Sequence, residues 1–133
     1  MLTRLTATLC VFSCCGCSYT AQIRTAESEL LRENTVQITA HLTNEQLQIF
    51  ANKELYLSMV LLECDDRREI YPMAVYIDGR PQEEFGDTSS NTITGLIPRM
   101  IYDRVRSPCV SISGGSYIRG KVSSNIVPVT PLR

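Results

Sequence analysis

The chain has 133 residues, enough for one domain with one hydrophobic core. Its 13 basic and 14 acidic residues leave a formal net charge of −1, which gives no basic footprint for nucleic acid, and no nucleic-acid partner is predicted. Hydrophobic residues make up 44% of the chain and charged residues 20%, which excludes a disordered protein.

Residues 1–16 have the layout of a secretory signal. Arg4 is the only charged residue among the first 22. The apolar stretch that follows, residues 5–15, has the length of a signal's hydrophobic region and is too short to span a bilayer as a helix. Small residues then lead into Gly16-Cys17-Ser18.

The sequence Cys14-Cys15-Gly16-Cys17 resembles the cleavage box of bacterial lipoproteins. In that family the signal is cut directly before a cysteine, whose thiol then carries a diacylglycerol within a three-chain anchor that includes palmitate. Gly16 matches the residue that the family prefers before the cut. The resemblance therefore implies a signal peptide over 1–16 and lipidation of Cys17, with Cys14 and Cys15 as rival anchors. Because Ser18 rather than Asp follows, it also implies the outer membrane, facing the periplasm.

The cysteine count favours Cys17 as the anchor. If Cys17 is lipidated and the earlier cysteines leave with the signal, only Cys64 and Cys109 keep free thiols. Two thiols in an exported protein predict one disulfide, here expected to join two sheets. By loop entropy such a bond contributes on the order of 4 kcal/mol.

Residues 17–34 are polar and mixed in charge. We expect them to form the lipid anchor and a tether, with a first strand leading away from the lipid as the alternative. Residues 26–33 have good helix propensity and can form a turn or two of helix. Their apolar content is low, so the sequence does not place them in the core.

The mature domain is expected from residue 35 onward. Residues 35–42 alternate apolar and polar side chains, as in a half-buried strand. Residues 43–46 are interpreted as a turn before a further strand over residues 47–51, with a short helix from Asn44 as the alternative. The apolar run Leu55–Leu62 predicts a central strand buried on both faces. A strand over 70–77 follows, with Pro72 at its beginning or at a sheet edge.

Turn signals separate the remaining strands. Asp78-Gly79 predicts a type I′ turn, and Gly114-Gly115 predicts a second hairpin turn. Residues 80–92 have loop composition. Short strands are predicted at 93–97, 109–113, 117–123 and 126–129. The pattern indicates an all-β fold, an immunoglobulin-like antiparallel β-sandwich over residues 35–133.

No motif indicates catalysis. His41 is the only histidine, and its place among the polar residues of an alternating strand indicates an exposed side chain. The acidic residues near Cys64 and in the 80–92 loop lack the spacing of a calcium loop and are interpreted as solvated turns; they are Glu63, Asp65, Asp66, Glu83, Glu84 and Asp87. We predict a protein that is not an enzyme and needs no metal or cofactor.

Two places are candidates for binding a partner. Arg99 and Arg104 lie near Tyr102, with Arg106 beyond them, and arginine and tyrosine are favoured at protein interfaces. Phe85 in the 80–92 loop is either an exposed anchor or packs back onto the core.

The sequence therefore predicts a lipid-anchored periplasmic protein with a small binding domain, whose partners are the membrane and another protein. An immunity or inhibitor protein for an envelope-acting effector fits this size. The alternative is an assembly accessory of an envelope secretion or conjugation complex, which would use strand edges for pairing.

Overall fold

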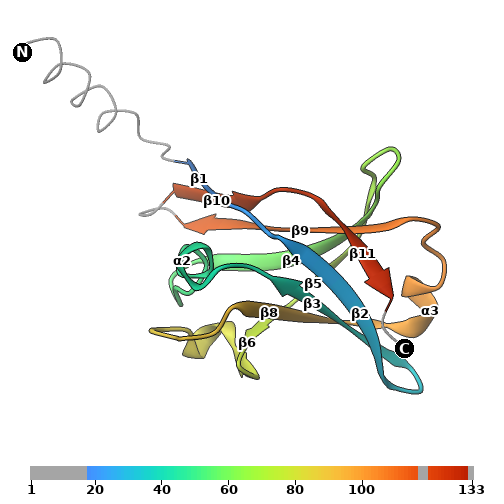
Figure 1. Ribbon diagram of the computed structural model, residues 1–133, viewed down its shortest axis with the longest axis horizontal. Helices are drawn as coiled ribbons and strands as arrows, with labels where there is room; N and C mark the ends of the chain where they lie inside the picture. The colour runs from blue at the N-terminus through green and yellow to red at the C-terminus, as the bar shows by residue number, and fades with distance from the viewer. Residues whose placement is uncertain (1–17, 117–119, 132–133) are drawn as a thin grey trace, which may run out of the picture.

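The computed structural model describes residues 18–116 and 120–131, so the predicted signal, Cys17 and its rival anchors lie outside the described residues. The described part consists mainly of strands, which confirms the predicted all-β class (Figure 1). In chain order the strands are β1 (Ser18–Ala21), β2 (Thr25–Arg32), β3 (Thr35–His41), β4 (Tyr56–Glu63), β5 (Glu69–Met73), β6 (Val75–Ile77), β7 (Arg80–Pro81), β8 (Thr92–Pro98), β9 (Pro108–Ser116), β10 (Gly120–Ser124) and β11 (Val127–Pro131). Three short helical turns lie between them, α2 (Asn44–Leu47), η1 (Gln82–Glu84) and α3 (Arg99–Tyr102). Within these ranges no helix is long and apolar enough to cross a membrane.

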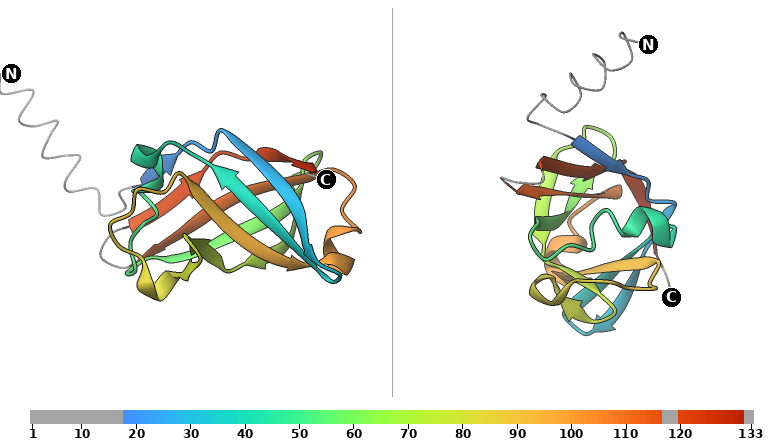
Figure 2. Two further views of the ribbon diagram at one scale, coloured as in Figure 1. Left: turned by 60° about the horizontal axis from the view of Figure 1, so that its bottom comes forward. Right: turned by 90° about the vertical axis from the view of Figure 1, so that its left-hand side faces the viewer.

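The strands form two layers that face each other across the core, as Figure 2 shows from two further directions. One layer contains β5, β4, β9, β10 and β1, and the other contains β2, β3, β8, β6 and β7. The two layers are connected to each other along both edges of the sandwich. On one side β5 continues through Ala74 into β6 of the other layer, and on the other side β11 pairs with β9 and then with β2.

Two strand pairs depart from the predicted antiparallel arrangement. β1 runs parallel to β10, and β2 runs parallel to β11, so the first two strands of the described chain pair with the last two. Between these two parallel pairs, the side chain of Asn125 connects the two segments: it binds the main chain of Ile23, which lies between β1 and β2. Its amide accepts a hydrogen bond from the Ile23 N–H at 2.7 Å and donates one to the Ile23 carbonyl at 3.0 Å. The side chain thus replaces the main-chain ladder where β10 ends and β11 begins.

This arrangement corrects the predicted domain boundary at residue 35, because Ser18–Ala21 and Thr25–Arg32 are already paired strands, in agreement with the alternative of a first strand. β2 pairs with β3 along its whole length, and the small side chains of Ala26 and Ser28 are buried. Ile23, just before β2, is also in the core. Residues 18–32 are therefore part of the sandwich and not a tether.

The core is built from the alternating residues of the strands. Val36, Ile38 and Ala40 of β3 are buried, as the period-two pattern predicted, and each pairs with an inward residue of β8. Burying one such aliphatic side chain stabilises the fold by roughly 1.5–3 kcal/mol. The second half of β4 is buried on both faces, as predicted, because Val60 and Leu62 form a small outer cluster with Cys109.

The helix alternative after β3 is correct, and the strand prediction for residues 47–51 is wrong. Thr43 caps α2, because its hydroxyl accepts a hydrogen bond from the Gln46 N–H at 3.2 Å. The helical turn brings Leu47 and Phe50 onto one side, and both are fully buried.

One predicted turn is confirmed and one is wrong. Asp78 and Gly79 have φ values of 54° and 74°, as a type I′ turn requires, and they join β6 to β7. Gly114 and Gly115 instead lie within β9. A Cβ atom on Gly114 would overlap the carbonyl oxygen of Tyr56, so this glycine lets β4 and β9 approach closely.

Candidate functional site

The predicted binding residues Arg99, Tyr102 and Arg104 lie together in one segment, which we call the α3 loop and define as residues 99–107. The loop follows β8 and leads into β9 at the end of the molecule opposite to Ser18 (Figure 1). Phe85 is not part of this site. It is 6% exposed and packs in the core, so the prediction of an exposed anchor at Phe85 is wrong and its alternative is correct.

The α3 loop contacts the tip of the β2–β3 hairpin, which we call the hairpin tip and define as residues 30–34. The Arg99 N–H donates a hydrogen bond to the Asn34 carbonyl at 2.8 Å. The Arg99 guanidinium reaches the Glu33 carbonyl at 3.5 Å, at the limit of a hydrogen bond. These contacts bring together two segments that are far apart in the sequence.

Tyr102 is turned toward the body of the domain. Its hydroxyl donates a hydrogen bond to the Ser28 hydroxyl at 2.9 Å, and its ring packs against the core. Ser28 is buried, with 5% exposure. Tyr102 therefore positions the loop on β2, whereas the sequence placed it in a surface strip.

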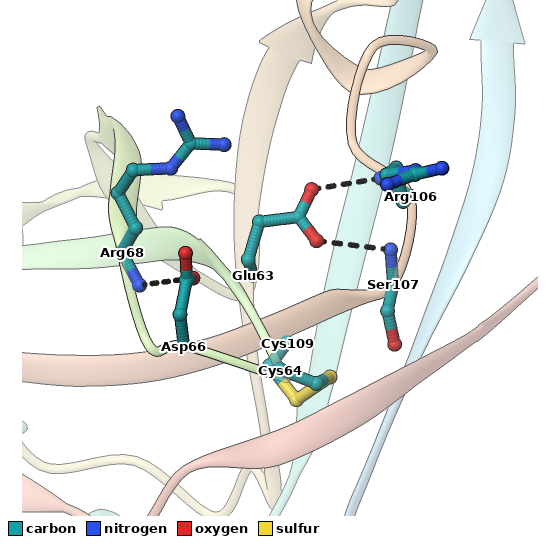
Figure 3. Close-up of a disulfide and its surroundings, with 7 residues drawn as sticks. All are labelled: Glu63, Cys64, Asp66, Arg68, Arg106, Ser107 and Cys109. Carbon is teal, nitrogen blue, oxygen red and sulfur yellow. Dashed lines mark hydrogen bonds between the residues drawn. A yellow bond between two sulfur atoms is a disulfide. The ribbon is translucent and has the colours of Figure 1, made fainter.

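Glu63 holds the other end of the loop. Its carboxylate is buried and accepts hydrogen bonds from the N–H groups of Arg106, at 2.8 Å, and Ser107, at 3.2 Å (Figure 3). The Cys64 N–H donates to the Ser107 carbonyl at 2.8 Å. The interpretation of Glu63 as part of a solvated turn is thus wrong, because its side chain satisfies two main-chain donors that have no strand partner.

The predicted disulfide lies directly beneath the loop. Cys64 and Cys109 are bonded, with their Cα atoms 5.1 Å apart (Figure 3). The sequence predicted a bond between the two layers, and this part of the prediction is wrong. The bond links the end of β4 to its neighbour β9 in the same layer, where Cys109 pairs with Leu62. The bond therefore ties the base of the α3 loop to the end of β4.

The outer surface of this end combines exposed apolar side chains with arginines. Met100 on α3 is 66% exposed, and Leu30 and Leu31 of the hairpin tip are 51% and 47% exposed. The exposed charged residues around them are Arg32, Glu33, Arg99, Asp103, Arg104 and Arg106. We call these apolar residues and the surrounding charges the distal surface. Within these two segments four exposed arginines stand against two exposed carboxylates, so the segments themselves carry a net positive charge.

One ion pair lies within the distal surface. Arg99 Nε is 3.3 Å from Asp103 Oδ2, and both side chains are half exposed or more. Exposed pairs of this kind contribute about 0–1 kcal/mol, so the pair orients α3 more than it stabilises the fold.

Polar side chains also lie close together away from the distal surface. His41 Nε2 lies 2.7 Å from Glu27 Oε1, on the outward side of β2 and β3. A small, open hollow lies between the β6–β7 turn and Phe85, and Asp78, Glu84 and Asp87 are among its lining residues. Across the described ranges, no group of three or more histidine, cysteine or acidic side chains is arranged to hold a metal ion.

Comparison with known proteins adds no relative: no protein-family model matches the chain, and no curated protein matches it. The α3 loop and the hairpin tip are therefore interpreted from their own geometry. The sequence indicated the arginines, whereas Leu30, Leu31 and Glu63 join the site only through contacts that are distant along the chain.

Proposed function

We propose that the protein is a lipid-anchored periplasmic lipoprotein that binds a protein partner through the distal surface, as an immunity or inhibitor protein does. The lipid anchor is Cys17, and the membrane is the outer membrane. The partner is an envelope-acting effector protein.

The anchor is supported by the signal-like residues 1–16 and by the disulfide. A Cys64–Cys109 bond persists in an oxidising compartment such as the periplasm and is rare in the cytosol.

Binding at the distal surface is supported by how the α3 loop is held. Within the described ranges, the buried polar or charged side chains are Ser28 and Glu63, and both of them fix this loop. Buried polar groups are expensive unless they are fully hydrogen-bonded, and here they order a surface segment. A loop that is ordered before binding loses less conformational entropy when a partner docks. This observation carries the proposal.

The chemistry of the distal surface defines the partner. Met100 of α3 and Leu30 and Leu31 of the hairpin tip are exposed apolar side chains in segments that also carry exposed arginines. Exposed apolar side chains among arginines are typical of a protein interface. The partner should therefore present an apolar pocket that is edged by carboxylates.

The alternative of an assembly accessory depends on a free strand edge. Among the described strands, those with one neighbour are β1, β5 and β7, and they have 4, 5 and 2 residues. β5 also contains Pro72, which lacks an N–H donor. Edges this short offer little main-chain pairing, which favours binding through side chains.

The test is capture of the partner with two variants at one position. The mature lipidated protein is used to isolate binding proteins from envelope extract, together with Met100→Asp and Met100→Leu. Met100→Leu keeps the apolar contact and should bind like the wild type. Met100→Asp should weaken binding about tenfold or more, because it places a carboxylate against an acidic, apolar pocket.

Two outcomes would contradict this function. Recovery of no stoichiometric partner by the wild type would reject a protein-binding role. Equal capture by Met100→Asp and by the wild type would move the interface away from the distal surface. A genetic experiment then separates an immunity protein from an assembly accessory. If the protein is an immunity protein, it should rescue cells that express the captured partner in the periplasm. If it is an assembly accessory, its deletion should leave an envelope complex incomplete.

A further inference from the structure

A second exposed surface lies at the end of the molecule where β1 begins. Four strands are aligned there in one row, in which Tyr56 of β4 pairs with Gly115 of β9, Gly115 with Lys121 of β10, and Lys121 with Ser18 of β1. Paired residues point to the same face of a sheet. Gly115 has no side chain, so Tyr56 and Lys121 share this outer face with only a glycine between them.

The aromatic side chain of this row is highly exposed. Tyr56 of β4 is 81% exposed, and Lys121 is also exposed. Tyr19 of β1 does not share this face, because it pairs with the buried Val122. We call Tyr56 and Lys121 the proximal surface. It lies at the opposite end of the long axis from α3 (Figure 1).

The proximal surface is next to the proposed point of attachment. Ser18 directly follows Cys17, and it is already a strand residue paired with Lys121. One residue of extended chain advances about 3.4 Å, so an anchor on Cys17 leaves no spacer between the acyl chains and the folded domain. The row itself extends sideways from Ser18 by about 14 Å, which is three strand spacings.

We infer that the proximal surface rests on the lipid headgroups and sets the orientation of the domain on the membrane. Tyrosine is enriched at membrane–water interfaces, because its ring is apolar and its hydroxyl stays hydrated. A lysine beside it extends its apolar stem along the surface and places its ammonium group near the lipid phosphates. The inference rests on the proposed lipid anchor, and it gives the domain a fixed orientation, with the distal surface directed away from the membrane.

The exposed residues at the two ends favour lipid headgroups, rather than a second protein, as the partner of the proximal surface. The large exposed apolar residues of the distal end are leucine and methionine, which suit a dry protein pocket, whereas the large exposed side chain of the proximal surface is the tyrosine Tyr56. A second protein at the proximal end would have to fit between the row and the membrane, where the lack of a spacer leaves no room.

The test uses tryptophan fluorescence, because the chain contains no tryptophan. The full lipidated protein is prepared as Tyr56→Trp and, as the matched control, Met100→Trp; both positions are exposed. Each is reconstituted into vesicles of phosphatidylethanolamine and phosphatidylglycerol, with and without brominated acyl chains. We expect the Tyr56→Trp emission to shift to shorter wavelength and to be quenched several-fold more strongly than the Met100→Trp emission.

The possible failures are distinguishable by flotation of the same vesicles. If both variants float with the vesicles and both emit as solvent-exposed tryptophans, the anchor stands and the headgroup contact is wrong. If neither variant floats, the lipid anchor itself is wrong and the contact is rejected with it. Equal quenching of both variants would reject the fixed orientation, because the domain would then lie flat on the membrane.

Discussion

The two ends of the long axis are held together by different interactions. At the proximal end, β4, β9, β10 and β1 are aligned by main-chain pairing, and glycine is needed where the strands approach most closely. At the distal end, the α3 loop has no strand partner and is fixed by Ser28, Glu63 and a disulfide.

This difference fits the proposed roles of the two ends, with membrane contact at the proximal end and partner binding at the distal end. Main-chain pairing depends little on side-chain identity, so it suits a support. A loop fixed by a few buried side chains leaves its outward side chains free to change, which suits recognition of a particular partner. The comparison can be tested by loosening each end in turn.

The largest effect is expected from removal of the disulfide. The Cys64→Ala, Cys109→Ala double variant should lower the free energy of unfolding by about 4 kcal/mol, because the unfolded chain regains the freedom of a long closed loop. Urea unfolding gives the magnitude, and amide hydrogen exchange gives the location. Exchange should accelerate most in the α3 loop and least in β1, and uniform acceleration would argue against an independently fixed distal end.

The next largest effect is expected at the proximal end from Gly114→Ala. The added methyl group would overlap the backbone of Tyr56, so the strands must separate, which costs about 3 kcal/mol. Gly86→Ala is the matched control, because no atom lies within 4 Å of the position of its Cβ. Amide exchange should accelerate in β4, β9 and β10 while the α3 loop stays protected. Equal stability of the two variants would show that β4 and β9 do not approach this closely.

The sequence predicts those parts of the molecule whose pattern is local. β3 shows a clean alternation, β4 is a continuous apolar run, and Asp78-Gly79 has one favoured turn geometry. The Cys64–Cys109 disulfide was predicted from the cysteine count, on the expectation that residues 1–17 hold a signal and a lipidated cysteine. Each of these features depends on neighbouring residues or on composition alone.

The features that the sequence missed depend on distant contacts. β2 places only the small residues Ala26 and Ser28 inward, so it lacks a hydrophobic alternation, and its parallel partner β11 lies at the other end of the chain. The inward placement of Phe85 likewise depends on the core that surrounds it.

The candidate binding site could be predicted only in part from the sequence, for the same reason. Arginines and a tyrosine near residue 100 are evident from composition, whereas the buried carboxylate of Glu63 looks like one member of an acidic turn. Only the fold shows that Glu63 faces the N–H groups of Arg106 and Ser107.

The smallest effect is expected from Tyr102→Phe, which removes one hydroxyl from the α3 loop. The Ser28 hydroxyl then loses its buried partner, and the free energy of unfolding should fall by about 1 kcal/mol. Ser28→Ala alone should cost a similar amount, and the double variant should cost about as much as either single change, because both disrupt the same hydrogen bond. Urea unfolding of the four proteins measures this coupling. Strictly additive losses would mean that the two hydroxyls do not interact, and the α3 loop would then be fixed by its other contacts, among them those of Glu63 and the disulfide.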